Sequence, residues 1–433
     1  MSSSGSHTPA PSHDWSANAR LIICTIILVL FVFASALSAW RKNVTQGFDE
    51  LAHASYVAHL QSNHEIWPTL ENMRMLDPAS LQFTSAANYL NHPPMFYAIM
   101  ARLGPTLEGH PGALLLHRFL NIVLAMIGLA VMLAIAAQLP RIEFYAYAAP
   151  LVCMPVLVPL AGAINNDNLA FAGGAVVTLA AWQLVATGRE KWLWVALAGI
   201  IAAAWAKLTG LLLAGGMVAV LLAYLLWRRR LQRSLVIAAA IALLAAAVPY
   251  LIFITQYGNP TPNTPAQMAL IADGAQAVGW NDAVRLSLPA YTVYFVSAFV
   301  TDWMPTLAQR GTFHYAMLVI PVMTLLCALA GLALSLRRLV RREETATDVV
   351  VIAGALALAA TFALHIGYSY GRHLTTGWMM DAYPRYYLPL AAIVPLASLS
   401  LLAAIETPRV RIMLAGFLVA GPPVFQLLGA PHG

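Results

Sequence analysis

The sequence predicts an all-α integral membrane protein, a bundle of about 11 transmembrane helices with interfacial helices in its outer loops. Of the 433 residues, 60% are hydrophobic and 10% are charged, whereas a soluble domain carries about 25% charged residues. About eleven apolar runs approach the ~20 residues that a helix needs to cross the hydrocarbon core. The basic residues are clustered between these runs and do not form the single patch of a nucleic-acid-binding protein.

The predicted spans share a length near 20 residues and a nearly uninterrupted apolar composition: 21–40, 114–138, 144–162, 167–187, 192–208, 210–227, 234–255, 314–336, 348–368, 386–404 and 410–429. We expect residues 1–19 to form a disordered cytoplasmic tail and residues 20–433 a single transmembrane domain. Because no small-residue cleavage site follows Trp40, the first run is expected to be a retained helix rather than a signal peptide. The division at Lys207 is open, since the two runs beside it could form one kinked hairpin.

The distribution of charge predicts the orientation. With the N-terminus in the cytoplasm, every basic connection falls on the cytoplasmic side: 189–191, 228–233, 337–342 and 409–411. That side then holds 14 of the 24 Lys and Arg residues and 7 of the 18 Asp and Glu residues. The polar stretches 41–113, 256–313 and 369–385 become outer loops, which are periplasmic if the protein lies in a bacterial inner membrane. The C-terminus is expected on the same side.

The first outer loop begins with Phe48-Asp49-Glu50-Leu51, after which apolar residues recur at helical spacing and predict an interfacial helix. Asp49 and Glu50 would lie at its N-terminus, where the helix dipole favours negative charge. Two interpretations stay open: the acids cap the helix, or they act chemically. A third is that Asp49, Glu50 and His53 share a divalent cation, because residues i and i+4 lie on one face of a helix.

The same loop ends in Asn91-His92-Pro93-Pro94, followed by an apolar segment. The prolines keep His92 out of a helix and then tolerate a helix start. His92 is therefore expected at a helix N-terminus, where an anion could bind. The alternative is a loop histidine without a specific partner.

Ionisable residues also interrupt the apolar runs. Arg118 lies near the start of the second predicted span, Lys207 lies at the end of the fifth, and Asp167 begins the fourth. At membrane depth such residues usually face a cavity or a partner. Arg118 and Lys207 could instead snorkel to the interface, and Asp167 could be a helix N-cap. Arg385 precedes Tyr386 at the outer end of the tenth span.

Taken in order, Asp49-Glu50 before a helix and His92-Pro93-Pro94 about 40 residues later resemble the GT-C glycosyltransferases. The similarity is to bacterial relatives of protein O-mannosyltransferases and of the aminoarabinose transferase that modifies lipid A. The segments 165–170, 207–211 and 385–389 look like a bacterial branch of the same superfamily. The resemblance runs from about Phe48 to Pro389, and it depends on the order, spacing and sidedness of these short motifs.

The resemblance implies transfer of a sugar, with inversion, from a polyprenyl-phosphate donor to an acceptor at the outer membrane face. Asp49 matches the position of the general base, and Glu50 matches its acidic neighbour. His92 stands where the aminoarabinose transferase has a phosphate-binding lysine, and Lys207 and Arg385 are further candidates for the donor phosphate. The other candidates for the pocket are Arg118, Asp167, Tyr386 and His53.

The residue types fit this chemistry, since a base needs a carboxylate near the acceptor hydroxyl and a phosphate leaving group needs fixed cations. The absence of a glycine-rich nucleotide loop favours a lipid-linked donor. The sequence requires no cofactor and leaves a divalent cation open. The acceptor, whether glycan, lipid or protein, is expected to bind the outer loop 256–313, which contains Trp280, Asp282, Arg285, Asp302 and Trp303.

Three other functions remain open. A secondary transporter or lipid flippase would also place charges within many spans, although here they gather at one membrane face. A glycan ligase of the O-antigen type would use a late outer loop, and 369–385 contains Arg372, His373 and Arg385. A catalytically inactive scaffold is the third, and the presence of Asp49 argues against it.

Overall fold

The computed structural model describes residues 17–228, 233–280, 283–302, 319–379 and 383–429, and the regular secondary structure of these residues is helical apart from one short hairpin. Seven helical segments are long and apolar enough to cross a membrane: α1 (Ala17–Arg41), α4 (Ala113–Ala136), α7 (Asp167–Thr187), Leu208–Trp227, α11 (Arg233–Tyr257), α14 (Val319–Arg341) and α15 (Ala346–Thr376). A pair bent by 61°, η4 (Pro384–Leu390) and α16 (Ile393–Ala404), passes the same test as one span. The predicted class, an all-α membrane protein, is confirmed, whereas the number of about eleven crossings is not.

The remaining predicted spans correspond to shorter or interrupted helices. Residues 144–162 are divided into α5 (Arg141–Val152) and α6 (Leu157–Ala161), with Pro155 between them. The others are α8 (Lys191–Ala206) and α17 (Pro408–Gly429), which packs against α5. A further helix, α13 (Leu288–Asp302), lies where an outer loop, 256–313, was predicted. Of the predicted tail, residues 1–16 lie outside the described residues and the last three begin α1.

The predicted outer loop between α1 and α4 is folded. We call residues 42–112 the head, which contains α2 (Glu50–Asn63), η1 (Leu70–Asn72), β1 (Arg74–Leu76), β2 (Phe83–Ala87) and α3 (Met95–Leu103). The two strands pair antiparallel, with Leu76 opposite Phe83. The hairpin lies close to α2 because Ser55 is small, and its hydroxyl accepts a hydrogen bond from the Leu76 N–H (2.9 Å). As predicted, a helix begins just after Pro93-Pro94, and α2 is buried along most of its length.

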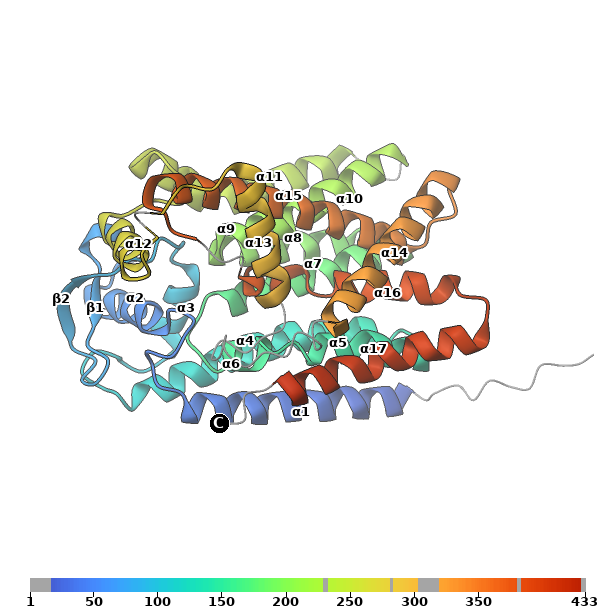
Figure 1. Cartoon of the computed structure of the whole chain (residues 1–433), viewed down its shortest axis with the longest axis horizontal. Coiled ribbons are helices and arrows are strands. Elements are labelled where there is room, and N and C mark those ends of the chain that lie inside the picture. Colours follow the sequence, from blue (N-terminus) through green and yellow to red (C-terminus); the bar gives the residue numbers. More distant parts are fainter. Residues whose placement is uncertain (1–16, 229–232, 281–282, 303–318, 380–382, 430–433) are drawn as a thin grey trace, which may run out of the picture.

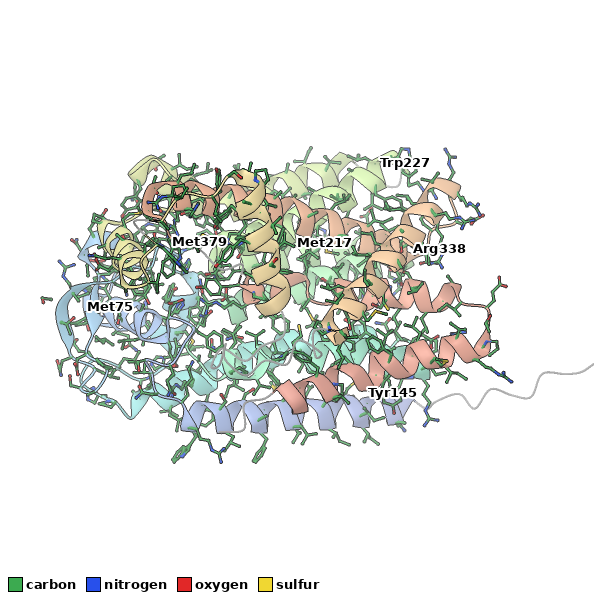
Figure 2. The ribbon with its side chains drawn as sticks, in the orientation of Figure 1. Met75, Tyr145, Met217, Trp227, Arg338 and Met379 are labelled. Atoms are coloured by element: carbon green, nitrogen blue, oxygen red, sulfur yellow. The ribbon has the colours of Figure 1, made fainter. Side chains whose placement is uncertain are left out.

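The head and α12 (Pro265–Ala277) lie together at one end of the bundle, at the left of Figure 1. Asn91 of the head joins them, because its amide donates to the Pro262 carbonyl (2.9 Å). Figure 2 places Met75 of the head at this end, and Trp227 and Arg338 toward the other end. Trp227 directly precedes the basic residue Arg228, and Arg338 belongs to the basic cluster 337–342, so these two labelled positions lie away from the head.

Helix α7 lies at the centre and packs against α4, α8, α15 and η4. A Cβ atom on Gly174 would lie 2.1 Å from the Pro389 carbonyl oxygen, so η4 crosses α7 at this glycine with no space for a side chain. Gly174 is two helical turns from Asp167, and Pro389 is four residues from Arg385. The crossing therefore determines where Arg385 lies relative to the N-terminus of α7.

The Gly174→Ala substitution is expected to destabilise the protein by about 1–3 kcal/mol, because the added methyl group forces η4 away from α7. The measurement is thermal unfolding of the detergent-solubilised chain. Gly416→Ala is the matched control: no atom lies within 4 Å of its Cβ position on α17, so it should be neutral or slightly stabilising. Equal unfolding temperatures for Gly174→Ala and wild type would contradict the close crossing.

Candidate active site

Asp49 occupies the N-cap position of α2, yet its side chain makes no capping hydrogen bond. Gly47, Phe48 and Asp49 all have positive φ angles (77°, 61° and 57°), a conformation that costs a non-glycine residue of order 1 kcal/mol or more. The turn directs the carboxylate away from the helix. Its Oδ2 accepts a hydrogen bond from Arg385 Nη2 (2.9 Å), and its Oδ1 accepts one from the Tyr89 hydroxyl (3.2 Å).

Arg385 extends this contact into a row of alternating charges. Its Nε lies 3.6 Å from Asp167 Oδ2, and Asp167 Oδ1 accepts a hydrogen bond from Lys207 Nζ (2.8 Å). The Tyr386 ring lies beneath both cations, 3.6 Å from Lys207 Nζ and 5.4 Å from the Arg385 guanidinium carbon. We call Asp49, Asp167, Lys207, Arg385 and Tyr386 the Asp49 site. Its members come from four segments far apart in the sequence.

Lys207 reaches Asp167 because the helix breaks at this residue. Lys207 is extended (φ −163°, ψ 148°) between α8 and α9 (Leu208–Gly210), which continues through η2 (Leu211–Gly215) into α10 (Gly216–Trp227). The break leaves the Ala206 carbonyl without its helical partner, and the Asn166 amide donates to it (2.7 Å). Interrupted helices are typical of ligand sites within membranes, where side chains and ordered polar groups satisfy the freed backbone. Lys207 is therefore buried and paired with Asp167, and it does not extend toward the surface as the snorkelling alternative requires.

Glu50 faces the opposite way from Asp49 and is wholly buried. Arg118 binds it through two hydrogen bonds, Nε to Oε1 (2.7 Å) and Nη2 to Oε2 (2.9 Å). The Ile164 N–H also donates to Oε1 (3.0 Å), and Lys42 Nζ lies 3.4 Å from Oε2. The remaining Arg118 nitrogen donates to the carbonyls of Ala39 and Lys42 at the end of α1. Glu50 and Arg118 thus join α1, α2, α4 and the segment before α7.

His53 lies on α2 of the head, where its neutral ring faces the segment before α7. The side-chain oxygen of Asn165, Oδ1, accepts a hydrogen bond from the Asp167 N–H (2.7 Å). This contact turns the Asn165 amide nitrogen toward His53 Nε2 (3.1 Å). Nε2 is therefore the acceptor, and Nδ1 carries the proton and contacts the Tyr97 hydroxyl (2.9 Å). Burial, followed by the positive charge of Lys207, lowers the pKa of His53 well below its usual value.

His92 stacks on the His53 ring, with centroids 5.9 Å apart and planes 9° from parallel. Burial, followed by the charge of Lys207, lowers the pKa of His92 well below its usual value. A phosphate would accordingly meet an N–H donor at His92 rather than a full positive charge. The Tyr56 hydroxyl donates to the His92 carbonyl (3.3 Å) and holds this turn against α2.

The Asp49 carboxylate stays ionised. Burial alone would raise the pKa of Asp49, but the Arg385 guanidinium and the hydrogen bond from Tyr89 outweigh it, and the pKa lies below its usual value. The Asp49 side chain is nevertheless 43% exposed, whereas that of Asp167 is 2% exposed. Asp49 is therefore the carboxylate of this site that a ligand can reach.

Four residues of this region were not among the sequence-predicted candidates: Lys42, Tyr89, Tyr97 and Asn165. Lys42 had a signal, because a basic residue at the outer end of the first span departs from the positive-inside pattern and so calls for a partner. Together with Arg118, Lys207 and Arg385 it supplies four cations against the three carboxylates of Asp49, Glu50 and Asp167. The excess charge is positive, which suits an anionic ligand.

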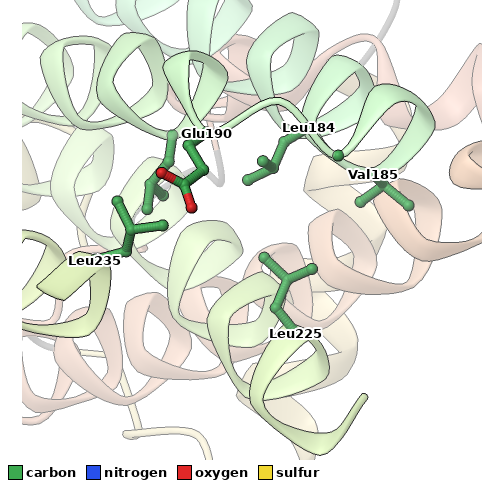
Figure 3. A pocket seen from close by; sticks show the side chains of 7 residues that line it. Leu184, Val185, Glu190, Leu225 and Leu235 are labelled. Carbon is green, nitrogen blue, oxygen red and sulfur yellow. The ribbon is translucent and has the colours of Figure 1, made fainter. Parts of the chain in front are cut away.

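Other sequence-predicted features lie elsewhere. No group of three or more His, Cys, Asp or Glu in the described part of the chain could hold a metal ion. Trp280 packs edge-on against Trp378, and Arg285 donates to the Trp280 carbonyl, whereas Asp282, Trp303 and the side chain of Asp302 lie outside the described residues. A cavity of about 70 Å³ lies at the far end of α7 beside Leu184, Glu190 and Leu225 (Figure 3), away from Asp167.

No family model matches the sequence, and no curated protein sequence matches it. In structure the chain is similar to ArnT from Cupriavidus metallidurans bound to undecaprenyl phosphate, at 14% identity and a TM-score of 0.36 over 83% of this chain and 79% of that one. It is likewise similar to ArnT from Cupriavidus metallidurans in the apo state, at 14% identity and a TM-score of 0.37 over 82% and 78%.

The Glu50→Gln substitution is expected to lower the free energy of unfolding by about 3–5 kcal/mol, because it leaves Arg118 buried without its counter-charge. The measurement is the unfolding midpoint in detergent. Glu108→Gln is the matched control: Glu108 also lies in the head, but it is only half-buried and its carboxylate accepts a hydrogen bond from the Ser62 hydroxyl instead of holding a buried cation, so little change is expected. A Glu50→Gln protein as stable as the control would contradict a structural role for the pair.

Proposed function

We propose that the protein is a glycosyltransferase that moves a sugar from a polyprenyl-phosphate donor to an acceptor hydroxyl at the head end of the bundle. The observation that carries this proposal is the exposed Asp49 carboxylate placed beside Arg385 and Lys207. A carboxylate can accept the hydroxyl proton, and the adjacent cations can stabilise a phosphate leaving group. The ArnT structure bound to undecaprenyl phosphate is consistent with a lipid-linked partner of this kind.

The proposed reaction forms one carbon–oxygen bond, breaks another and transfers one proton. The acceptor oxygen attacks the anomeric carbon from the side opposite the phosphate, and its proton passes to Asp49. The bond between the anomeric carbon and the phosphate oxygen breaks, and the phosphate leaves with the electron pair. The anomeric centre is inverted, and polyprenyl phosphate and the glycosylated acceptor are the products.

In this proposal Arg385 and Lys207 bind the donor phosphate, while Tyr386 provides the surface on which both cations lie. His92 contributes a neutral N–H donor, and His53 positions it by stacking. Asp167 holds Lys207 in place through the 2.8 Å contact. Glu50 and Arg118 act as positioning residues, because both oxygens of Glu50 are already occupied by Arg118 and its neighbours.

The polyprenyl-linked ligase alternative relied on Arg372, His373 and Arg385 acting together in one late loop. In the structure Arg385 lies against Asp49, whereas Arg372 and His373 belong to α15, which continues to Thr376. Arg372 contacts the segment that leads into α12, so the three residues divide between two places. The position of Arg385 therefore favours a single site at Asp49 over the ligase alternative, which requires Arg385 beside Arg372 and His373.

Asp49→Asn should reduce the rate of sugar transfer by about 10²–10⁴-fold, because an amide cannot accept the proton. The assay measures labelled sugar leaving polyprenyl phosphate in proteoliposomes that contain a membrane-derived acceptor fraction. Asp77→Asn is the matched control: this head aspartate is half-buried and its carboxylate accepts only from Ala79 and Ser80 of its own turn among the described residues, so the rate should be unchanged.

Full transfer by Asp49→Asn would remove Asp49 as the base. Uptake or translocation of the lipid-linked sugar by the wild type, without transfer, would favour a transporter or flippase instead.

Tyr89→Phe should move the acid-side loss of activity to higher pH. The base works only when ionised, so activity disappears as the pH falls through the pKa of Asp49, and the Tyr89 hydrogen bond helps to keep that pKa low. Tyr257→Phe is the control, since its hydroxyl contacts Leu70 and Glu71 of the head instead of Asp49. The measurement is kcat/KM against pH, and identical acid limbs for Tyr89→Phe and wild type would show that Asp49 does not set this limb.

A further inference from the structure

Arg372 on α15 is a buried cation whose partners are all neutral. Its Nη2 donates to the Asn263 Oδ1 (2.7 Å), the Tyr368 hydroxyl (2.6 Å) and the Gln267 Oε1 (3.2 Å), and its guanidinium lies 4.6 Å from the Tyr368 ring centroid. Its Nε is buried and has no hydrogen-bond partner among the described residues. We call Arg372, Asn263, Gln267 and Tyr368 the Arg372 cluster.

The other buried cations of the described chain are each paired with a carboxylate. Arg118 pairs with Glu50, Lys207 pairs with Asp167, and Arg385 pairs with Asp49. Arg372 is equally buried, yet no ion pair joins it to a carboxylate within the part of the chain that the structure describes. Burying a charge without a counter-charge is costly, and a bound anion would supply one.

The Arg372 cluster is open on one side. Asn263 is exposed and Gln267 is half-buried. Because the side-chain oxygens of both amides face Arg372, their NH₂ groups point away from it and remain donors for a ligand. Asn91 of the head donates to the Gln267 oxygen (3.3 Å) and to the Pro262 carbonyl, which holds this arrangement in place.

The Arg372 cluster lies near the Asp49 site but is separate from it. His365 precedes Arg372 by two turns on the same face of α15, a rise of about 10 Å. His365 contacts the Tyr387 hydroxyl (2.9 Å), and its ring lies 5.7 Å from that of Tyr386 in the Asp49 site. Arg372 thus lies about two helical turns from the residue that contacts the Asp49 site, and an anion bound at Arg372 is a different group from a phosphate held by Arg385 and Lys207.

We propose that the Arg372 cluster is a subsite for an anionic oxygen group, a phosphate or a carboxylate, carried by the acceptor. The assignment to the acceptor rests on the proposed glycosyltransferase function, whereas the binding of an oxyanion does not. Arg372 forms the ion pair, Asn263 and Gln267 donate from their amides, and Tyr368 supports the guanidinium face. The acceptor is therefore an acidic molecule.

The Asn263→Asp variant tests the subsite. It places a carboxylate of the same shape 2.7 Å from Arg372 Nη2, so the protein should fold at least as well while the cation is neutralised internally. The purified full chain in phosphatidylcholine nanodiscs is titrated with inorganic phosphate at constant ionic strength, and the thermal unfolding midpoint is followed. The titration is made in the wild type and in an Arg385→Gln background, which removes the proposed donor-phosphate site.

Asn263→Asp should raise the phosphate concentration needed for half of the stabilisation by about tenfold or more. Gln276→Glu, which adds the same charge at an exposed position of α12, should leave the titration unchanged. A phosphate response that Asn263→Asp does not weaken would overturn the subsite. Should Arg385→Gln fail to fold, the comparison in the wild-type background decides, because Asn263→Asp leaves the Asp49 site intact.

A second nanodisc composition tests whether the anion that binds the Arg372 cluster comes from the acceptor or from a lipid headgroup. In phosphatidylglycerol nanodiscs the wild-type phosphate response should persist; its loss there would mean that a headgroup already fills the cluster and would overturn the assignment to the acceptor. Because phosphate binding is measured without turnover, its outcome is independent of the Asp49→Asn assay, and the failure of one proposal is distinguishable from the failure of the other.

Discussion

The ion pair between Glu50 and Arg118 is the contact on which the rest of the site depends. It joins residues 68 apart in the sequence, and it is bidentate and buried. The same arginine donates to two carbonyls at the end of α1, and the same glutamate accepts a hydrogen bond from the Ile164 N–H before α7. A buried pair of this kind adds little net stability compared with apolar packing, but it tolerates only one geometry. It therefore specifies where α2 begins relative to the bundle.

The geometry of Asp49 follows from the position that the Glu50–Arg118 ion pair gives to the start of α2. Glu50 must point inward to reach Arg118, so the preceding residue must turn outward, and the chain does this through consecutive positive φ angles at Gly47, Phe48 and Asp49. The conformation is strained for the two non-glycine residues, and the neighbouring ion pair stabilises it. The result is a carboxylate at a helix N-terminus that does not cap the helix and remains available to Arg385 and to a ligand.

Sequence patterns predicted many of the helices of this fold but few of the contacts between side chains of different elements. Hydropathy identified most of the long helices, Pro93-Pro94 predicted the start of α3, and sidedness predicted that Asp49, Lys207 and Arg385 share one end. The hairpin of β1 and β2 was missed because its strands are short and lack alternation. The end of α15 was placed eight residues too early, because the helix continues through polar residues such as Arg372 whose partners lie on another segment.

No local sequence pattern predicts which side chains pair across the site. Arg385 and Asp49 are 336 residues apart, and they meet because η4 crosses α7 at a glycine with no room for a side chain. Periodicity reports how an element faces the core, whereas a contact of this range depends on how the elements pack. For the same reason the sequence could name Asp49 and Glu50 together but could not assign their opposite directions.

In the proposed reaction, the competition of two carboxylates for Arg385 links donor binding to the strength of the base. Asp167 is buried and held by Lys207, so it cannot leave; Asp49 is exposed and is held by Arg385 and by one hydroxyl. An entering phosphate that takes a share of the Arg385 charge therefore weakens the contact to Asp49 first. As the guanidinium turns toward the phosphate, the stabilisation that keeps the pKa of Asp49 low decreases, and the carboxylate becomes a stronger base. In the proposed reaction the base is thus strengthened only when a donor is present, which couples proton transfer to occupancy of the phosphate site.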